Sequence, residues 1–466
     1  MFGKVDATII QQLEDIVNAR HVLTAEDLVE PYTRDESGGP PGNPEVVVKV
    51  GSTQEVARIF ELARRHTIPL TPRGAGTGLC GGAVPSRGGI VLSLERMNRI
   101  VEIDERNLMA VVEPGVITGE LHRAVEAEGL FYPPDPASLD SCTIGGNVAT
   151  GAGGPRAVKY GVTRDYVYGL EAVLPDGRTL RCGGKLVKDE AGFDLTRLLV
   201  GSEGILAVIT KIVLRLVALP QARTDLLVPF RNFQAAGRCV SRIIRERMLP
   251  TTIEFMERDS IEACGKLLQK ELPYADAEAH LLIQLDGHRR KAVDLDCEQV
   301  GEICLDNGAI DVLMASGTEE RNRLWEARRK ILEALRLESD VIQLEDLVVP
   351  RAAIPKLLDG VHRISEHHGV RTVSYGHAGD GNVHVNLLKE SIPDSKWARS
   401  LPVIREELYE LTLSLGGSIS GEHGIGTSRR AYLERGLGAT SVELMRGIRQ
   451  TFDPQGILNP GTMLPE

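Results

Sequence analysis

The first half of the chain alternates short apolar runs with amphipathic segments. Residues 6–35 begin with apolar positions every three to four residues, which predicts a short helical lead-in followed by an irregular segment. The valine run at 46–50 predicts a buried strand, and 53–66 predicts an amphipathic helix that Ser52 or Thr53 caps. Further strands are predicted at 69–72, 90–94, 110–112 and 170–174, with a helix at 118–128. This order is typical of an α/β segment with many glycine turns.

The pattern changes near residue 219, where Leu219–Thr224 predicts a domain boundary. Beyond it we expect a helix at 232–246, strands at 252–256 and 280–285, and a long helix ending near Leu337. That order favours a domain built on an antiparallel sheet, so the whole chain is predicted to be α+β. The expected domains are a lead-in at 1–39, a glycine-rich domain at 40–218 and a second domain at 219–466.

Composition narrows the function classes. With 466 residues, 42% of them hydrophobic and 26% charged, the chain has the length for more than one folded domain. A net charge of −11 argues against nucleic-acid binding, because a phosphate backbone attracts a basic surface. No run approaches 18 apolar residues and the N-terminus lacks a signal peptide, so we expect no transmembrane segment and a cytoplasmic location. The 7 cysteines are too dispersed to hold an iron–sulfur cluster, so redox chemistry would need another carrier.

The densest glycine run, Pro72–Gly82, has the sequence PRGAGTGLCGG. Glycines let backbone N–H groups converge on an anion, which suits a pyrophosphate, although a purely structural turn remains the alternative. The loop is not a nicotinamide site, because it does not follow the first strand directly and no helix follows it. Two more glycine loops, Cys142–Gly154 and Val200–Ile209, could wrap the same extended ligand.

Taken together, the segments PRGAGTG, PPDPAS, TIGGN and GSEGILAVIT resemble the FAD-binding domain of the vanillyl-alcohol-oxidase flavoprotein superfamily. The resemblance covers residues 40–465 and points to the branch of FAD-linked 2-hydroxy-acid dehydrogenases that contains D-lactate dehydrogenases, D-2-hydroxyglutarate dehydrogenase and the glycolate oxidase flavin subunit. It implies a two-subdomain FAD-binding domain and a C-terminal substrate (cap) domain with an antiparallel sheet. It also implies that FAD is held by Arg73, Gly74, Ala75, Gly76, Thr77, Gly78, Pro134, Asp135, Ser138, Thr143, Gly145, Gly146, Asn147, Gly153, Glu203, Gly204 and Ile209.

Some members of this superfamily attach FAD covalently through a histidine near the first loop. This chain has no histidine between His66 and His122, and the spacing of Cys142 to Gly145 resembles the non-covalent branch. We therefore expect non-covalent FAD.

A second motif, Tyr375–Asn386, carries two histidines around an Asp380-Gly381 pair, which is a strong signal for a two-residue hairpin turn. That turn predicts that His377 faces His384 across the hairpin, with Asn386 on the same face. Both imidazoles could then reach one metal ion, although a polar sheet surface is the alternative.

Glu422 and His423, in the segment Ser420–Gly426, offer a carboxylate and a further imidazole. Two imidazoles and a carboxylate leave coordination positions open for a substrate, as in catalytic metal sites. The resemblance supports His377, His384 and Glu422 as ligands and His423 as the acid–base residue. Zinc is our first choice, and manganese or iron would fit the same ligands.

The resemblance also implies that Arg328 binds the substrate carboxylate, with Asn386 nearby; a solvated basic helix face is the alternative for Arg328. Relatives acting on a five-carbon diacid offer a threonine and a lysine where this chain has Leu332 and Gln343, which favours D-lactate, glycolate or another short monoacid.

The expected activity is metal-assisted oxidation of a short D-2-hydroxy acid by FAD. Electrons would pass to an electron-transfer flavoprotein or an iron–sulfur subunit, through which the protein could also sit at the membrane, and the chain could form a homo-oligomer. The competing interpretations are a D-2-hydroxyglutarate dehydrogenase, a non-catalytic FAD-binding electron-transfer subunit, or a relative of the same fold with different chemistry, such as an ether-lipid synthase or aryl-alcohol oxidase.

Overall fold

The computed structural model describes residues 2–25, 29–315 and 317–465; the predicted lead-in therefore falls partly on residues 26–28, which lie outside this range. The chain forms two compact units. The first contains Met1–Gly153, Val162–Leu219 and Glu422–Glu466, and the second contains Gly154–Gly161 and Pro220–Gly421. The chain thus crosses between the units several times, once at Leu219–Pro220. The division into sequence domains at 218/219 stays a prediction.

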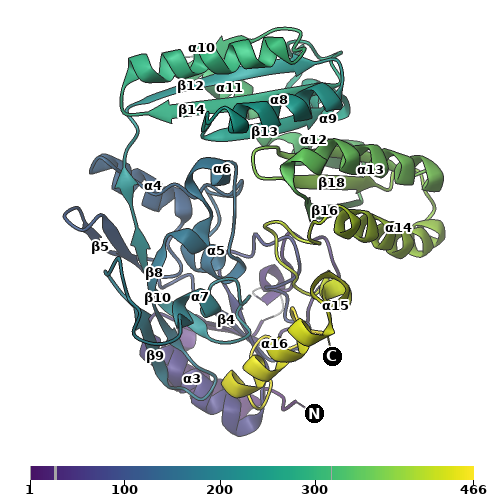
Figure 1. Cartoon of the computed structure of the whole chain (residues 1–466). Coiled ribbons are helices and arrows are strands. Elements are labelled where there is room, and N and C mark those ends of the chain that lie inside the picture. The colour runs from purple at the N-terminus through teal and green to yellow at the C-terminus, as the bar shows by residue number, and fades with distance from the viewer. Residues whose placement is uncertain (1, 26–28, 316, 466) are drawn as a thin grey trace. The chain divides into compact units, whose positions relative to one another are not determined.

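The first unit contains a four-stranded sheet in the order β1-β2-β4-β3, in which β2, β4 and β3 are parallel (Figure 1). Buried side chains of α1 and α3 share one hydrophobic core with these strands. Ser52 Oγ accepts from Glu55 N at 3.2 Å and so caps α3, as predicted. The bounds are α1 Ala7–Val17, β1 Val22–Leu23, β2 Val46–Lys49, α3 Thr53–His66, β3 Leu70–Arg73 and β4 Ile90–Ser93.

This unit also contains an antiparallel five-stranded sheet, in the order β5-β6-β10-β8-β9, and a two-stranded sheet of β11 and β7. The C-terminal segment also returns here, because Leu70 N donates to Ile457 O at 2.8 Å. The bounds are β5 Ile100–Asp104, β6 Met109–Val112, α4 Thr118–Ala127, β7 Leu130–Phe131, α5 Ile144–Thr150, β8 Val167–Val173, β9 Thr179–Gly183, α7 Leu195–Leu199, β10 Val208–Arg215, β11 Val217–Ala218, α15 Leu433–Leu437 and α16 Ala439–Phe452.

The second unit is built on one antiparallel seven-stranded sheet, in the order β15-β12-β14-β13-β17-β18-β16. This confirms the α+β class and the antiparallel sheet predicted for the C-terminal part. The bounds are α6 Ala157–Tyr160, β12 Ala222–Phe230, α8 Phe233–Arg245, β13 Thr252–Glu257, α9 Arg258–Leu268, β14 Ala279–Gly287, α10 Arg290–Asp306, β15 Leu313–Ala315, α11 Thr318–Arg329, α12 Ile331–Glu338, β16 Ile342–Val348, α13 Ile354–His368, β17 Arg371–His377, β18 Asn382–Leu388 and α14 Asp394–Ser414.

Helices cover the two faces of this sheet differently. On one face, Phe233 of α8 packs edge-on against Phe255, and Tyr409 of α14 donates to Glu345. On the other face, α9, α11 and α12 pack against apolar residues of the central strands. Because side chains alternate along a strand, Glu254 and Met256 point to this second face while Phe255 points to the first.

The predicted long helix ending near Leu337 is wrong. The structure has α10, the strand β15, and then α11 and α12, the last ending at Glu338. Gly308 adopts a left-handed conformation (φ +86°), and β15 pairs with β12, so sheet pairing interrupts the helical pattern. No helix in the described part of the chain combines the length and apolar character needed to cross a membrane.

Candidate active site

The three glycine loops meet in the first unit, as their spacing predicted. Gly74 lies against Thr143, and an added Cβ there would come closer to Thr143 Oγ1 than van der Waals contact allows. Gly204, in a left-handed conformation at φ +66°, lies against β3, because its Cβ would come 2.8 Å from Pro72 Cγ. Glu203 N also donates to Ala149 O at 2.8 Å, which joins the third loop to α5. Neighbouring side chains leave no room for a Cβ at Gly74 or Gly204, so both positions favour glycine.

The TIGGN segment begins α5, an element that the sequence reasoning missed. Thr143 caps the helix by accepting from Gly146 N at 3.2 Å, and Gly145 N donates to Pro114 O at 2.8 Å. Asn147 is buried and donates from Nδ2 to Thr118 Oγ1 at 2.8 Å. Short-range signals were present here, namely a threonine cap and a following helical run, but the two glycines concealed them.

The other residues expected to hold FAD all lie in this unit. Arg73 ends β3, and its guanidinium donates to Ala83 O at 3.3 Å and Pro31 O at 3.1 Å. Loop 74–78 follows β3 directly. Ile209 lies on β10, and Pro134, Asp135 and Ser138 lie between β7 and α5. Their roles toward FAD stay predictions.

Glu203 has an additional structural partner. Its carboxylate accepts from Ile425 N and Gly426 N, both at 2.7 Å, and so holds the segment that carries His423. Burial raises the pKa of Glu203, and these two hydrogen bonds only partly oppose the shift. Cys80 Sγ donates to His423 O and Gly424 O, both at 3.1 Å. Glu422 lies against Gly153, since a Cβ on Gly153 would come 3.1 Å from Glu422 Cβ.

The hairpin of the second unit has a longer turn than the predicted two-residue Asp380–Gly381 turn. His377 pairs with Asn382, not with His384, and His384 pairs with Tyr375. Tertiary contacts override the local turn signal, because Gly379 N donates to Ile253 O at 3.0 Å and Gly381 packs on Val349 O. The register differs by two residues, and a two-residue shift keeps every side chain on its face.

The two imidazoles therefore still come together. His377 Nε2 and His384 Nε2 lie 3.4 Å apart, and both side chains are almost fully buried. Asn386 shares the face with them, as predicted, because it follows His384 by two residues on β18. We call the surface formed by His377, His384 and Asn386 the imidazole face.

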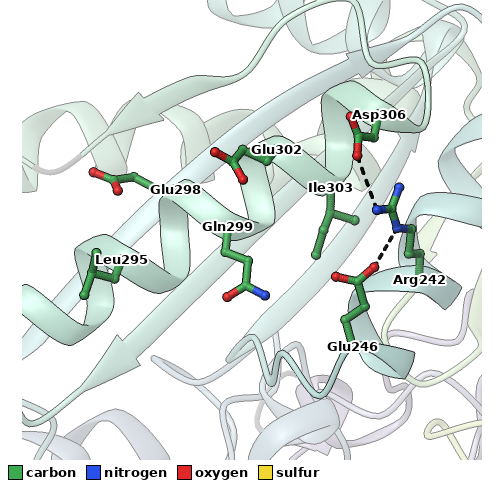
Figure 2. Close-up of a pocket in the computed structure, with 8 residues that line it drawn as sticks. All are labelled: Arg242, Glu246, Leu295, Glu298, Gln299, Glu302, Ile303 and Asp306. Atoms are coloured by element: carbon green, nitrogen blue, oxygen red, sulfur yellow. Dashed lines mark hydrogen bonds and ion pairs between the residues drawn. The ribbon is translucent and has the colours of Figure 1, made fainter.

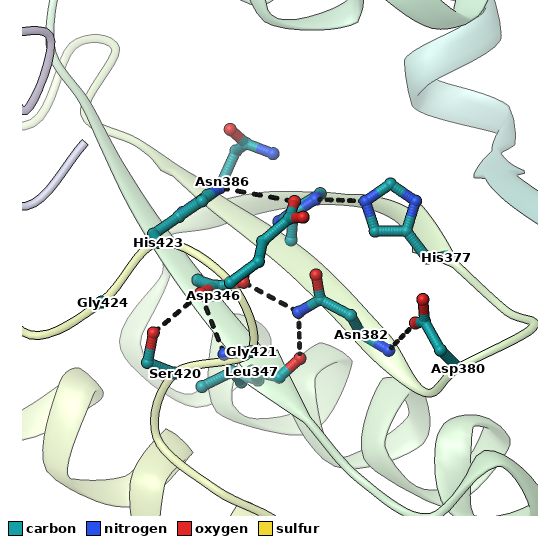
Figure 3. Close-up of polar contacts among 12 residues, drawn as sticks. Asp346, Leu347, His377, Asp380, Asn382, Asn386, Ser420, Gly421, His423 and Gly424 are labelled. Carbon is teal, nitrogen blue, oxygen red and sulfur yellow. Dashed lines mark hydrogen bonds and ion pairs between the residues drawn. The ribbon is translucent and has the colours of Figure 1, made fainter. Parts of the chain in front are cut away.

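Two carboxylates on flanking strands stand behind the imidazoles, and the sequence reasoning missed both. Glu254 of β13 pairs with His377, and Asp346 of β16 pairs with His384. Figure 3 shows Asp346 at the centre of a set of donors that includes Asn382, Ser420 and Gly421. The available signal was an acidic residue within an otherwise apolar strand, in TIEFME and in IQLEDLV.

Arg328, predicted to bind the substrate, lies on α11 and is buried. Its Nη2 lies 2.6 Å from Glu254 Oε2, and its guanidinium stacks over Tyr375 with 4.8 Å from Cζ to the ring centroid. The Tyr375 ring in turn lies 5.4 Å from that of His384, so Tyr375 joins the arginine to the imidazoles. Burial excludes the alternative of a solvated basic helix face.

The buried polar atoms of this region that have no hydrogen-bond partner within the described residues include one on Asn386 and one on Arg328. Asn386 Oδ1 is a buried acceptor, while its Nδ2 donates to Val373 O at 3.0 Å. Arg328 Nε is a buried donor. Buried polar groups are almost always satisfied, so an unsatisfied acceptor and an unsatisfied donor indicate a polar ligand.

Gln343 and Leu332, the two residues expected from the sequence to bear on the substrate, lie on β16 and α12. Gln343 pairs with Leu387 and donates to Glu345 Oε1 at 2.9 Å, so it points away from the imidazole face. Leu344, which pairs with Asn386, lies on the imidazole face together with Asp346 of the same strand. Leu332 is half-buried in α12. The amide of Gln343 therefore does not face the imidazoles, whereas Leu344 lies on their side of the sheet.

A separate concave surface lies between α8 and α10, on the face of the sheet opposite the imidazoles (Figure 2). Its one cation, Arg242, is paired with Glu246 at 2.7 Å and with Asp306 at 3.3 Å. Its remaining polar groups are carboxylates and one amide, and it contains no histidine or cysteine. The imidazole face is the stronger candidate site, because it brings two buried imidazoles together with buried carboxylates on the neighbouring strands.

Two families of known proteins match the chain. Residues 219–463 match the family of FAD linked oxidases, C-terminal domain, and residues 44–183 match the FAD binding domain family. The chain is similar to glycolate oxidase subunit GlcD of Bacillus subtilis, with 42% identity over 432 residues, 93% of this chain and 91% of the relative. It is also similar to a D-lactate dehydrogenase of Anaerostipes hadrus, with 36% identity over 99% of this chain and 98% of the relative.

Among solved structures, p-cresol methylhydroxylase shares the fold, with a TM-score of 0.80 and 19% identity, over 97% of this chain and 96% of the other. The expected superfamily and fold are therefore confirmed. The chain belongs to the FAD-linked oxidase family, and it is an FAD-dependent oxidoreductase of the D-lactate dehydrogenase and glycolate oxidase type.

Proposed function

We propose that this protein oxidises a short D-2-hydroxy acid, D-lactate first and glycolate second, to the 2-oxo acid at the imidazole face. The observation that carries the proposal is the buried His377–His384 pair beside an unsatisfied acceptor, Asn386 Oδ1, and an unsatisfied donor, Arg328 Nε. A 2-hydroxy acid offers the complementary groups, because its hydroxyl donates and its carboxylate accepts.

The two imidazoles fit a divalent metal. Their Nε2 atoms face each other at 3.4 Å, and one ion about 2.0–2.1 Å from each nitrogen would fit between them. We propose Glu422 as the third ligand. Gly421 N donates to Asp346 Oδ2 at 2.9 Å, and Asp346 pairs with His384, so the chain enters Glu422 from a point fixed next to the imidazoles. Zinc is the first candidate, with manganese or iron as alternatives.

A bound divalent ion lowers the pKa of a coordinated hydroxyl, and bound FAD accepts the α-hydrogen with its electron pair. The residues of this chain supply the remaining steps. His423 takes the hydroxyl proton, since an imidazole titrates near neutral pH, and the C–O single bond becomes the C=O bond of the product. Arg328 orients the substrate carboxylate through its planar guanidinium, and Asn386 Oδ1 accepts from the substrate hydroxyl before that proton passes to His423.

A short monoacid fits better than a diacid. Leu344 of β16 lies on the imidazole face, and Leu332 is a half-buried apolar residue of α12. Neither could pair with a second carboxylate, and leaving a buried carboxylate unpaired costs several kcal/mol, on the order of the desolvation of a charge.

We propose a separate protein, an electron-transfer flavoprotein or an iron–sulfur subunit, as the electron acceptor. The relative from Bacillus subtilis is itself named a subunit, which supports a partner. The dispersed cysteines of this chain offer no internal relay for single electrons.

The test is anaerobic bleaching of the flavin by D-lactate, L-lactate, glycolate and D-2-hydroxyglutarate, with kcat/KM for each. We expect D-lactate or glycolate to reduce the flavin at least several-fold faster than the diacid. A several-fold preference for D-2-hydroxyglutarate would overturn the proposed substrate. If none of the four acids bleached the flavin, the proposed activity itself would be wrong. Formation of stoichiometric hydrogen peroxide, with no rise in turnover when electron carriers are added, would overturn the proposal of a separate electron acceptor.

A further inference from the structure

Each imidazole of the site has a buried carboxylate directly beside it on the neighbouring strand. Glu254 pairs with His377 in the β13–β17 ladder, and Asp346 pairs with His384 in the β16–β18 ladder. Both carboxylates have no exposed surface. Directly opposed residues share a face of the sheet with Cβ atoms about 4.5–5.5 Å apart, so the register itself fixes these two pairs.

The orientation of the rings follows from these pairs. His377 Nδ1 lies 2.7 Å from Glu254 Oε1, and His384 Nδ1 lies 3.6 Å from Asp346 Oδ1. In both rings Nδ1 faces a carboxylate, while the Nε2 atoms face each other at 3.4 Å. For His377 the carboxylate lies within hydrogen-bond distance and keeps the proton on Nδ1, which leaves the Nε2 lone pair for a metal. For His384 the 3.6 Å separation is an electrostatic contact longer than a hydrogen bond, and it favours the same tautomer more weakly.

Other groups hold the carboxylates themselves in place. Arg328 Nη2 lies 2.6 Å from Glu254 Oε2. Asp346 accepts from Asn382 Nδ2 at 2.8 Å and from Ser420 Oγ and Gly421 N at 2.9 Å. These donors offset the cost of burying two negative charges, so each carboxylate is fixed before any ligand arrives.

We propose that Glu254 and Asp346 are positioning residues that set the tautomer and orientation of His377 and His384 for metal binding through Nε2. This inference rests on the proposed metal-assisted function. It also gives Arg328 a second role, since Arg328 fixes Glu254. Glu254 has the shorter contact and is expected to contribute more to metal affinity than Asp346.

A substitution of Glu254 by glutamine tests the tautomer directly. The amide has a single acceptor oxygen, but Arg328 and the His377 ring both require an acceptor at this position. If the oxygen faces the guanidinium, the amide NH₂ faces Nδ1 and drives the ring proton to Nε2, where it blocks metal binding. Asp346→Asn creates the same conflict among Asn382, Ser420 and Gly421.

The chain offers matched controls on the opposite face of the same strands. Glu257 is buried, accepts from Ser374 N at 2.8 Å and lies 3.0 Å from His362 Nε2, so it is also a carboxylate–histidine pair on β13. Glu345 is fully buried next to Asp346 and lies 2.8 Å from Arg405 Nε. Glu257→Gln and Glu345→Gln thus remove comparable buried charges away from the imidazoles.

The experiment measures Zn²⁺ stoichiometry and affinity of the full-length, FAD-loaded protein by competition with a chromophoric chelator. We expect Glu254→Gln to weaken Zn²⁺ binding about 10–100-fold, Asp346→Asn to weaken it less, and both controls to stay within about twofold of wild type. Flavin content should not change. Nitrogen NMR of labelled histidines in metal-free protein should show the His377 proton move from Nδ1 to Nε2 in Glu254→Gln.

Glu254→Asp provides a second route if the glutamine variant does not fold. It keeps the charge but withdraws the oxygen from Nδ1, so Zn²⁺ affinity should still fall. Wild-type Zn²⁺ affinity in a folded Glu254 variant, with binding abolished by His384→Ala, would overturn the positioning role and leave the metal site intact. A wild-type protein that binds no divalent ion yet oxidises its substrate would instead overturn the metal in the proposed function.

Discussion

Gly74→Ala is the most informative single change in the predicted FAD cradle. The added methyl would collide with Thr143 Oγ1, the atom that caps α5 by accepting from Gly146 N at 3.2 Å. Gly74 does not adopt a left-handed backbone, so an alanine there is strained by the collision and not by its own conformation. The collision can be relieved only if Thr143 leaves the cap.

The magnitude follows from that displacement. Losing a threonine N-cap costs about 1 kcal/mol, and forcing the side chain off its rotamer costs roughly another 1 kcal/mol. Gly74→Ala should therefore lower the free energy of unfolding by about 2 kcal/mol. In a Thr143→Ala background the nearest atoms would be Thr143 Cβ at 3.7 Å and Gly146 N at 3.8 Å, which is ordinary contact. There the same change should cost nothing, or gain a few tenths of a kcal/mol, roughly the usual effect of removing a flexible glycine.

Urea denaturation of Gly74→Ala, Thr143→Ala and the double variant measures this coupling as a double-mutant cycle. Gly184→Ala is the control, because an added Cβ there meets nothing within 4 Å. The weakened cradle should also raise the FAD dissociation constant, which flavin fluorescence reports. Equal losses from Gly74→Ala in both backgrounds would refute the steric reasoning.

Three further outcomes are expected. Acid or heat should release intact FAD into solution, because no histidine lies between His66 and His122; flavin that stays with the denatured chain would contradict this. A chelator or His384→Ala should abolish substrate-dependent flavin reduction but leave FAD bound, and turnover above about a tenth of wild type would exclude a catalytic ion there. His362→Gln should destabilise the protein most below pH 6.5, because the hydrogen bond that His362 donates to the Glu257 carboxylate raises the pKa of His362 in the folded state. That stabilisation is lost as the pH rises through the raised pKa of His362, and the partial exposure of the side chain keeps it below about 1 kcal/mol. A difference in Tm between wild type and His362→Gln that did not change between pH 5.5 and 9 would refute this reasoning.

The sequence predicted what local patterns determine. The strands at 46–49 and 90–93, the helix at 53–66 and the shared face of His377 and His384 were correct, because periodicity and face are local properties. The turn between the histidines was wrong, because contacts from Ile253 and Val349 fix it from outside the hairpin.

Glu254 shows that local sequence patterns do not reveal long-range pairing. It lies more than a hundred residues before His377, and only the β13–β17 pairing brings the two together. A lone glutamate in an apolar strand signals a buried charge, but it does not identify its partner. Strand order in a sheet is a long-range property, so the carboxylates behind the imidazoles were missed while the imidazoles themselves were found.

The interleaved chain has a consequence for recombining this protein with its relatives. Exchanging residues 220–421 as a cassette would join the two parents between Gly421 and Glu422. Gly421, which is held by Asp346, would then come from one parent and the proposed ligand Glu422 from the other. The exchange would also leave behind residues 154–161, whose Lys159 and Tyr160 bind Asp286. A chimera that transplants a new specificity therefore needs residues 154–161 and the segment that begins at Glu422 from the same parent as the sheet.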